Sequence, residues 1–241
     1  MVDRKVNHQI KGVGIFIAAI LMIGAIALGT ADAVTTQNLL TNPGAESGDL
    51  SGWTILATGG NGWGIWGVDT TDYEGPYEGN YCFLTSYGWC KRGQEIDLQA
   101  KGYTEAQLDR SPHVQVEEWF GQANPYCRGR YYVKIELRDT NHKVITSWDS
   151  GEHYTTWRGI GLLSWDKLSH EFSNYGAGLR YIYWEDGGID EKYWAGYYGA
   201  KLDSASLTLA ADVPACTPLG LIALVALLSA IAAVTLVQKR R

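Results

Sequence analysis

Alternation of apolar and polar side chains is the feature of this sequence that most limits its fold. In residues 131–138, four apolar side chains share one face of an extended strand, while Lys134 and Glu136 share the other. The four apolar residues are Tyr131, Val133, Ile135 and Leu137. Three further segments are mostly rich in the β-branched and aromatic residues that favour strands: 144–148, 179–185 and 205–210.

Turn signals separate these segments. Gly-Gly-Asn-Gly at 59–62 and Asp-Gly-Gly at 186–188 are typical of tight connections between strands. Only one helical turn is expected, over 104–108, where Thr104 and Gln107 have the spacing of a capping box. Strands without long helices between them favour an antiparallel sandwich over an α/β fold. The sequence therefore predicts an all-β protein built as an antiparallel β-sandwich.

The first 33 residues have the pattern of a targeting segment. A basic start is followed by an apolar run over 13–28 and by Ala-Asp-Ala at 31–33, which fits the small-x-small rule of a signal-peptidase site. We expect 1–33 to be a signal peptide that is cleaved after Ala33. An uncleaved anchor helix is the alternative.

The last residues predict a membrane span. Residues 219–237 are uncharged and have about the length that a helix needs to cross the hydrocarbon core. The basic tail 238–241 favours the cytoplasmic side. We therefore expect a single-pass protein whose body lies on the extracellular face of the membrane and whose C-terminus is cytoplasmic. A buried core helix is the alternative.

The short linker 212–218 resembles the sorting motifs of prokaryotic surface proteins, which place a Pro/Gly-containing motif before an apolar helix and a basic end. That resemblance implies cleavage at this point and attachment to the cell envelope. Cys216 within the linker is open to two interpretations, an acylated juxtamembrane cysteine or an inert one.

The body of the chain, residues 34–211, is acidic and rich in Trp and Tyr. It holds all ten Trp and all fifteen Tyr. The two ends hold six of the 20 Lys and Arg and three of the 26 Asp and Glu, which leaves 14 basic and 23 acidic residues and a net charge of −9. Such a charge speaks against a nucleic-acid partner and fits a neutral ligand. Tyr and Trp offer a flat apolar face with a polar edge, which suits stacking on a sugar ring.

Three cysteines lie in the body: Cys82, Cys90 and Cys127. Because an extracellular location permits disulfides, we expect a bridge between Cys90 and Cys127, with one thiol left over. No CxxC pair or zinc-site spacing occurs, and the histidines show no metal-site spacing. We therefore expect no metal and no cofactor.

Several blocks of the body resemble the F-box-associated family. Thr85–Leu98 reads TSYGWCKRGQEIDL, and is followed by QAKGY over Gln99–Tyr103. His170–Arg180 reads HEFSNYGAGLR. The remaining blocks are the opening Asn38–Glu46 with Gly52-Trp53, Val114–Phe120, Glu185–Gly188 and Tyr193–Ala200. They occur in order from about residue 38 to 209.

The resemblance implies a fold and a function. The family fold is an antiparallel sandwich related to galactose-binding and carbohydrate-binding jelly rolls. Its best-known members bind the inner chitobiose of high-mannose N-glycans through loops at one end, whereas other members bind no known glycan. We therefore expect a lectin-like protein that recognises a glycan or glycoprotein, either N-glycan-like or an envelope polysaccharide. A structural or adhesion protein that binds protein partners is the alternative.

The resemblance also implies site residues. The Tyr-Trp pair before the last strand corresponds to Tyr193 and Trp194, with Trp194 stacking on a pyranose and Tyr193 adding a hydrogen bond. The aromatic residue of the Ser-x-x-Trp-Cys block, Tyr87, forms a second wall, and Trp89 in the same block is expected in the core.

Two departures from the family pattern affect specificity. Ala195 stands where the sugar-binding members carry Lys after the Tyr-Trp pair. An acidic residue that contacts sugar in those members has its nearest counterpart in Asn124, which offers an amide hydrogen bond.

Catalysis is not expected, because no nucleophile elbow, HExxH or P-loop pattern occurs. A glycan-active enzyme with two facing carboxylates is the remaining alternative. The F-box that joins intracellular relatives to a ubiquitin ligase is not expected here, so we expect no ubiquitin-ligase partner.

Overall fold

The computed structural model describes residues 37–67, 75–158 and 165–210. The expected signal peptide 1–33, linker 212–218, membrane span 219–237 and basic tail 238–241 lie outside these residues. Within the described part of the chain, no helix has the length and apolar character needed to cross a membrane.

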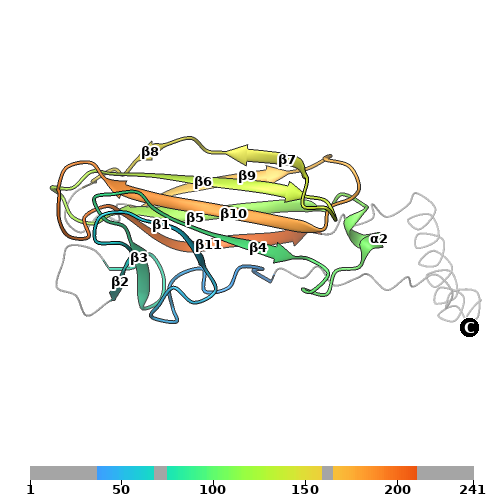
Figure 1. Ribbon diagram of the computed structural model, residues 1–241, viewed down its shortest axis with the longest axis horizontal. Coiled ribbons are helices and arrows are strands. Elements are labelled where there is room, and N and C mark those ends of the chain that lie inside the picture. Colours follow the sequence, from blue (N-terminus) through green and yellow to red (C-terminus); the bar gives the residue numbers. More distant parts are fainter. Residues whose placement is uncertain (1–36, 68–74, 159–164, 211–241) are drawn as a thin grey trace, which may run out of the picture. The chain divides into compact units, whose positions relative to one another are not determined.

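Two antiparallel sheets make up the fold, as the alternation predicted (Figure 1). The first sheet has the order β1-β4-β10-β6-β7, and β8 pairs with β6. Its strands are β1 (Thr54–Thr58), β4 (Cys90–Asp97), β10 (Tyr181–Asp190), β6 (Gly129–Arg138), β7 (Val144–Asp149) and β8 (His153–Tyr154). The second sheet has the order β2-β3-β11-β5-β9. Its strands are β2 (Gly64–Gly67), β3 (Tyr81–Leu84), β11 (Ala200–Ala210), β5 (His113–Gln122) and β9 (Trp165–Phe172).

The strand β6 shows why this sequence forms a sandwich. Its residues alternate between buried and half-buried along the whole strand, and the four apolar residues expected on one face are all buried. They meet the inward face of the second sheet, where Phe120 stacks on Tyr131 with 4.1 Å between ring centroids. Burying a large apolar side chain contributes about 1.5–3 kcal/mol, so this alternation fixes which face points inward.

The single described helix, α2 (Glu105–Leu108), lies in the connection between β4 and β5. The side chain of Thr104 accepts a hydrogen bond from the backbone N–H of Gln107, and the side chain of Gln107 accepts one from the backbone N–H of Thr104. The capping box expected from the sequence is confirmed. Leu108 is buried and fastens the turn to the core.

A buried ionic cluster joins the two sheets. Arg92 on β4 donates from Nε and Nη2 to the carboxylate of Asp186 on β10, over 2.8 and 3.1 Å. Its Nη2 also donates to Glu118 on β5 of the other sheet, over 3.2 Å. All three side chains are fully buried. The guanidinium carbon lies 3.7 Å from the ring centroids of both Trp53 and Phe83.

The two acids of this cluster differ in their role. Burial raises the pKa of Glu118 well above its usual range, the nearby Asp186 carboxylate raises it further, and Arg92 opposes both effects. The raised pKa favours the protonated form of Glu118. Asp186 is the partner of the Arg92 charge, and it also accepts a hydrogen bond from the indole N–H of Trp184 over 2.9 Å. Buried charges require pairing, which Arg92 and Asp186 provide for each other, although Arg92 Nη1 and Glu118 Oε2 have no hydrogen-bond partner among the described residues.

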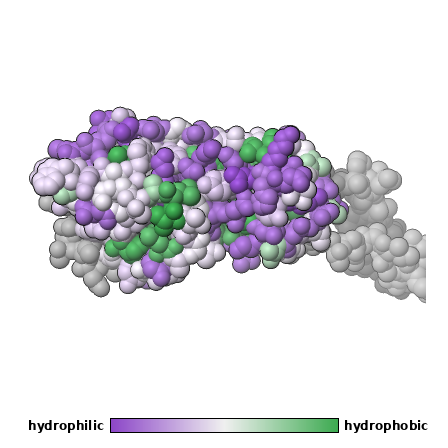
Figure 2. All heavy atoms as spheres, viewed as in Figure 1, coloured by the Kyte–Doolittle hydropathy of each residue, from purple (hydrophilic) through white to green (hydrophobic). Residues whose placement is uncertain are grey.

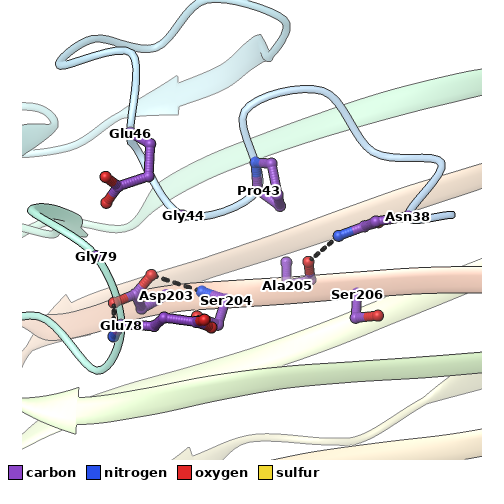
Figure 3. A pocket seen from close by; sticks show the side chains of 10 residues that line it. All are labelled: Asn38, Pro43, Gly44, Glu46, Glu78, Gly79, Asp203, Ser204, Ala205 and Ser206. Carbon is purple, nitrogen blue, oxygen red and sulfur yellow. Dashed lines mark hydrogen bonds between the residues drawn. The ribbon is translucent and has the colours of Figure 1, made fainter.

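The segment before β3 is tied to the last strand by one buried carboxylate (Figure 3). Asp203 on β11 accepts hydrogen bonds from the backbone N–H groups of Tyr77, Glu78 and Ser204, over 2.8, 3.2 and 2.6 Å. The carboxylates of Glu46 and Glu78 lie on the same hollow of about 410 Å³. Burial raises the pKa of Asp203 to about 7, against the effect of these N–H donors.

The raised pKa of Asp203 predicts a pH dependence of stability. From the ordinary value of 3.8 up to about 7, the folded chain binds this proton more tightly than the unfolded chain does. The free energy of unfolding therefore falls as the pH rises through that window, by at most about 4 kcal/mol at roughly 1.4 kcal/mol per pKa unit. Urea unfolding at several pH values between 4.5 and 7.5 measures this change in the free energy of unfolding. Asp203→Asn should flatten the dependence, and an equal slope in that variant would contradict the assignment.

Candidate functional site

Four loops gather at one end of the sandwich, at the left in Figure 1. They join β1 to β2, β3 to β4, β5 to β6, and β10 to β11. Antiparallel strands bring alternate connections to the same end, so the topology alone assembles these loops. In Figure 2 this end is pale to hydrophilic, whereas a hydrophobic patch lies further along the visible face. Tyr and Trp have intermediate hydropathy, so a pale surface is compatible with exposed rings.

One hydroxyl joins three of the loops. Ser86 Oγ accepts a hydrogen bond from the backbone N–H of Asn61 over 2.9 Å and donates one to the carbonyl of Gly196 over 2.7 Å. Asn61 Oδ1 in turn accepts the backbone N–H of Gly196 over 2.8 Å. The loop that holds Tyr87 is therefore fastened to the loop that holds the Tyr-Trp pair.

The loop between β10 and β11 begins with a turn set by Asp190. Its carboxylate accepts the backbone N–H groups of Lys192 and Tyr193, over 2.8 and 3.0 Å. Tyr193 is half-buried and packs against a small cluster of Leu84, Ala123 and Cys127. Its role is therefore at least partly structural.

Trp194, the next residue, is 85% exposed, which makes it the most exposed of the large apolar side chains in the described residues. A tryptophan is usually well buried, because its surface is large and mostly apolar. The turn of Asp190 fixes the loop before Trp194, and the hydrogen bonds of Gly196 with Asn61 and Ser86 fix it after Trp194, while the ring itself is exposed to solvent. Such a ring is a ready platform for the flat face of another molecule.

Tyr87 lies on the loop between β3 and β4 and is 38% exposed. Its ring packs against the backbone of Gly60, where an added Cβ would lie 2.8 Å from the ring. Gly60 also has a positive φ of 62°, so both its conformation and this close approach favour glycine. The structure places Tyr87 on the same end as Trp194, joined through Ser86.

Asn124 lies on the loop between β5 and β6 and is half-buried. Its Oδ1 accepts the backbone N–H of Tyr126 over 2.8 Å, so this oxygen holds the local turn. The loop meets the Tyr-Trp loop directly, since the hydroxyl of Tyr193 donates to the carbonyl of Tyr126 over 3.4 Å. All four expected site residues thus lie on loops of one end, and their contact with a ligand stays a prediction.

Three exposed tyrosines of these loops were not singled out from the sequence. Tyr126 is 64% exposed, and Tyr198 is 41% exposed with its ring centroid 5.2 Å from that of Tyr193. Tyr197 is 38% exposed and donates to the carbonyl of Asn61 over 3.2 Å. The signal that points to Tyr197 and Tyr198 is the density of aromatic residues beside the glycines of the block 193–199, and no such signal marks Tyr126.

The expected disulfide between Cys90 and Cys127 is wrong for this structure, in which both thiols are free and buried. The thiol of Cys90 instead donates to the carbonyls of Gly59 and Gly62, over 3.5 and 3.2 Å. Cys127 packs against Leu84, and burial raises its pKa to about 12. Each thiol thus contacts groups of its own surroundings and not the other thiol.

The expectation that Trp89 lies in the core is also wrong. Trp89 is half-buried and contacts Tyr132 edge to face, with 5.5 Å between centroids. It precedes β4, and Lys91 lies over both rings. The aromatic residue that fills the core beside Arg92 is Trp53, from the opening block. No group of three or more metal-ligating side chains occurs in the described residues.

The fold and the loop end together define a β-sandwich that exposes aromatic rings on the connections at one end. The chain belongs to the F-box associated family, whose model matches residues 31–209. The resemblance seen in the sequence blocks is thereby confirmed.

Relatives in this family are similar over most of the body. The chain is 33% identical to F-box only protein 44 of Homo sapiens over 182 residues, which cover 74% of this chain and 69% of that one. It is 36% identical to F-box only protein 6 of Homo sapiens, over 72% of this chain and 59% of that one. It is 35% identical to F-box only protein 2 of Bos taurus, over 71% and 58%. The chain thus spans less than two thirds of the length of F-box only protein 6 and of F-box only protein 2.

Solved structures give only distant likenesses. A complex of TmCBM61 with β-1,4-galactotriose has a TM-score of 0.48 and 16% identity, over 72% of this chain and 99% of that one. The CBM22-1 xylan-binding domain of Paenibacillus barcinonensis Xyn10C has a TM-score of 0.44 and 16% identity, over 74% and 98%. Likenesses at this level carry no information about a ligand.

Proposed function

We propose that this protein is a lectin-like module that binds an oligosaccharide on the loop end of its sandwich. The observation that carries the proposal is Trp194, which stands 85% exposed on a loop that is hydrogen-bonded on both sides. An exposed indole contributes little to folding, so a ring held in this way serves contact with a partner. The role is binding rather than catalysis.

A sugar is the partner that this surface suits. The axial hydrogens of a pyranose form an apolar face that stacks on an aromatic ring, while its hydroxyls need polar groups at the ring edges. Trp194 offers the face. The phenolic groups of Tyr126 and Tyr198, both exposed, offer donors and acceptors nearby.

The sugar specificity is proposed to differ from that implied by the family resemblance. Ala195 removes a cation after the Tyr-Trp pair, and Asn124 uses its side-chain oxygen to hold the backbone of Tyr126. The lysine that follows the Tyr-Trp pair in the sugar-binding members is thus absent, and the side-chain oxygen of Asn124 already accepts a hydrogen bond within its own loop. Other polar groups of the loop end then decide which glycan is bound.

A glycan array tests this proposal. The full chain, solubilised in detergent and tagged, is applied beside its Trp194→Ala variant. Binding of a defined set of glycans by the parent chain, lost in the variant, supports the proposal. A parent chain that binds no glycan and instead binds a protein of a cell surface would replace it with the adhesion alternative.

We further propose that the body is displayed on the extracellular face of the membrane, with residues 219–237 spanning it. The sequence pattern of the two ends supports this. Protease added to intact cells that make the protein should remove the body, and the same protease should spare a cytoplasmic marker. Full protection of the body on intact cells, with digestion only after lysis, would reject this topology.

A further inference from the structure

Two exposed cations of the loop end, Arg128 and Lys192, lie beside aromatic rings. The ammonium of Lys192 lies 5.5 Å from the ring centroid of Tyr193. The guanidinium carbon of Arg128 lies 3.8 Å from the ring centroid of Tyr154. The two backbone segments that carry these cations are neighbours, because the N–H of Glu191 donates to the carbonyl of Arg128 over 3.0 Å.

Neither cation forms an ion pair with a carboxylate of the described residues, although three carboxylates lie in the same region. Glu152 and Glu191 both pair with Arg130, each over 2.5 Å. Asp190 is 4% exposed and accepts two backbone N–H groups. These three acids equal Arg128, Arg130 and Lys192 in number, but each of them already has an ion-pair or hydrogen-bond partner. Burial raises the pKa of Asp190, and the charge of Lys192 opposes this effect without forming an ion pair, so Arg128 and Lys192 are the exposed charged groups of this region that keep no carboxylate partner.

Three other free cations of the described residues do not share this setting. Lys101, Arg110 and Lys143 also lack ion pairs, and none of them lies over a ring among the described residues. They follow β4, α2 and β6, so they lie at the opposite end of the sandwich (Figure 1). Lys91, over Trp89 and Tyr132, is the remaining free cation that contacts rings, and it starts β4 next to the loop end.

We infer that the ligand of the loop end is an acidic saccharide, whose carboxylate or sulfate group is held by Arg128 and Lys192 while a sugar ring stacks on Trp194. The inference rests on the proposed glycan binding and narrows it to a chemical class. A planar guanidinium can donate two parallel hydrogen bonds to one anionic group, and an ammonium adds a compact charge. The rings beneath the two cations hold their side chains over the surface.

The acidic body does not oppose this arrangement at close range. A net charge of −9 repels an anion from a distance, but at physiological salt charges are screened beyond about 8 Å. Two free cations in contact with the anion then outweigh the acids that lie beyond that distance, while Glu152 and Glu191 nearby are paired with Arg130. Binding should accordingly weaken as salt is raised, because the attraction acts on an exposed surface.

Matched pairs of glycans test the inference on the full chain in detergent. The probes are sialylated and asialo-lactosamine, tetragalacturonate and its methyl ester, and sulfated and unsulfated lactose. The variants are Arg128→Gln and Lys192→Gln, with Lys143→Gln as the control cation at the opposite end and Trp194→Ala as the control for ring stacking. Near-UV circular dichroism checks that each variant is folded.

The expected result is that the acidic member of at least one pair binds about tenfold more tightly than its neutral partner, as one or two charge-assisted hydrogen bonds provide. Arg128→Gln and Lys192→Gln should each remove most of that preference, and Lys143→Gln should leave it unchanged. The responding pair shows whether the acidic group is a carboxylate or a sulfate.

Three results would overturn the inference. Equal binding of acidic and neutral partners, lost only in Trp194→Ala, would refute the acidic ligand and leave the proposed glycan binding intact. An acidic preference that persists in both cation variants would refute the roles of Arg128 and Lys192. Absence of binding to any glycan by the parent chain would refute the proposed function and the inference together.

Discussion

Replacing Trp194 by alanine is expected to weaken glycan binding by roughly 5- to 150-fold, which corresponds to about 1–3 kcal/mol for the loss of a stacked aromatic at a recognition site. Because the ring is 85% exposed, the free energy of unfolding should change by less than about 0.5 kcal/mol. Isothermal titration with the best glycan of the array and urea unfolding measure the two quantities on the same preparations.

A second exposed aromatic residue provides the control. Tyr81 begins β3 at the end remote from the loop of Tyr87, and it is 39% exposed. Tyr81→Ala should leave binding unchanged. Loss of folding in Trp194→Ala, or unchanged binding by that variant, would show that Trp194 is not the platform.

Replacing Arg92 by methionine is expected to lower the free energy of unfolding by about 3–5 kcal/mol, the range for removing one partner of a buried ion pair. The Asp186 carboxylate would remain buried without its cation, and the rings of Trp53 and Phe83 would lose the guanidinium between them. Urea unfolding followed by tryptophan fluorescence measures the change. Lys91→Met, one residue earlier and half-buried, is the matched control and should cost about 0.5 kcal/mol or less.

Glu118→Gln separates the two acids of the cluster. Burial raises the pKa of Glu118 and favours its protonated form, so a neutral amide of the same shape should change the free energy of unfolding by only about 1 kcal/mol. A loss as large as that of Arg92→Met would mean that Glu118 is ionised in the folded protein. The pair of variants thus distinguishes a charge that the fold requires from a hydrogen bond that it tolerates.

The sandwich was predictable because its signals are local. The alternation in β6, the glycine-rich turn at 59–62 and the capping box of Thr104 each act within a few residues, and each appears in the structure as expected. The connection expected at 186–188 is wrong, because these residues lie inside β10 and pair with β4 and β6 on either side. The buried cluster was not predictable in this way. Arg92 and its partners Glu118 and Asp186 come from three strands and two sheets, and a charged residue within a strand usually indicates a solvent face.

The candidate site was predictable only as far as the family blocks reach. They pointed to Tyr87 and Trp194 on two loops, and the topology brings those loops to one end. Tyr126 lies where the sequence departs from the family, so no block indicated it. The wrong disulfide has a similar cause, because the expected location permits a bridge but does not set the distance or direction of two thiols. Cys90 and Cys127 each pack locally instead.

The hydroxyl of Ser86 has a consequence for the entropy of binding. It links the loops of Asn61, Tyr87 and Gly196 through two hydrogen bonds, so these loops are already ordered before any ligand arrives. A mobile loop would lose about 0.5–1.5 kcal/mol for each side chain that binding immobilises. Here that loss has largely occurred during folding. A weak stack on one indole can therefore yield measurable affinity, and repeated copies on a surface would multiply it through avidity.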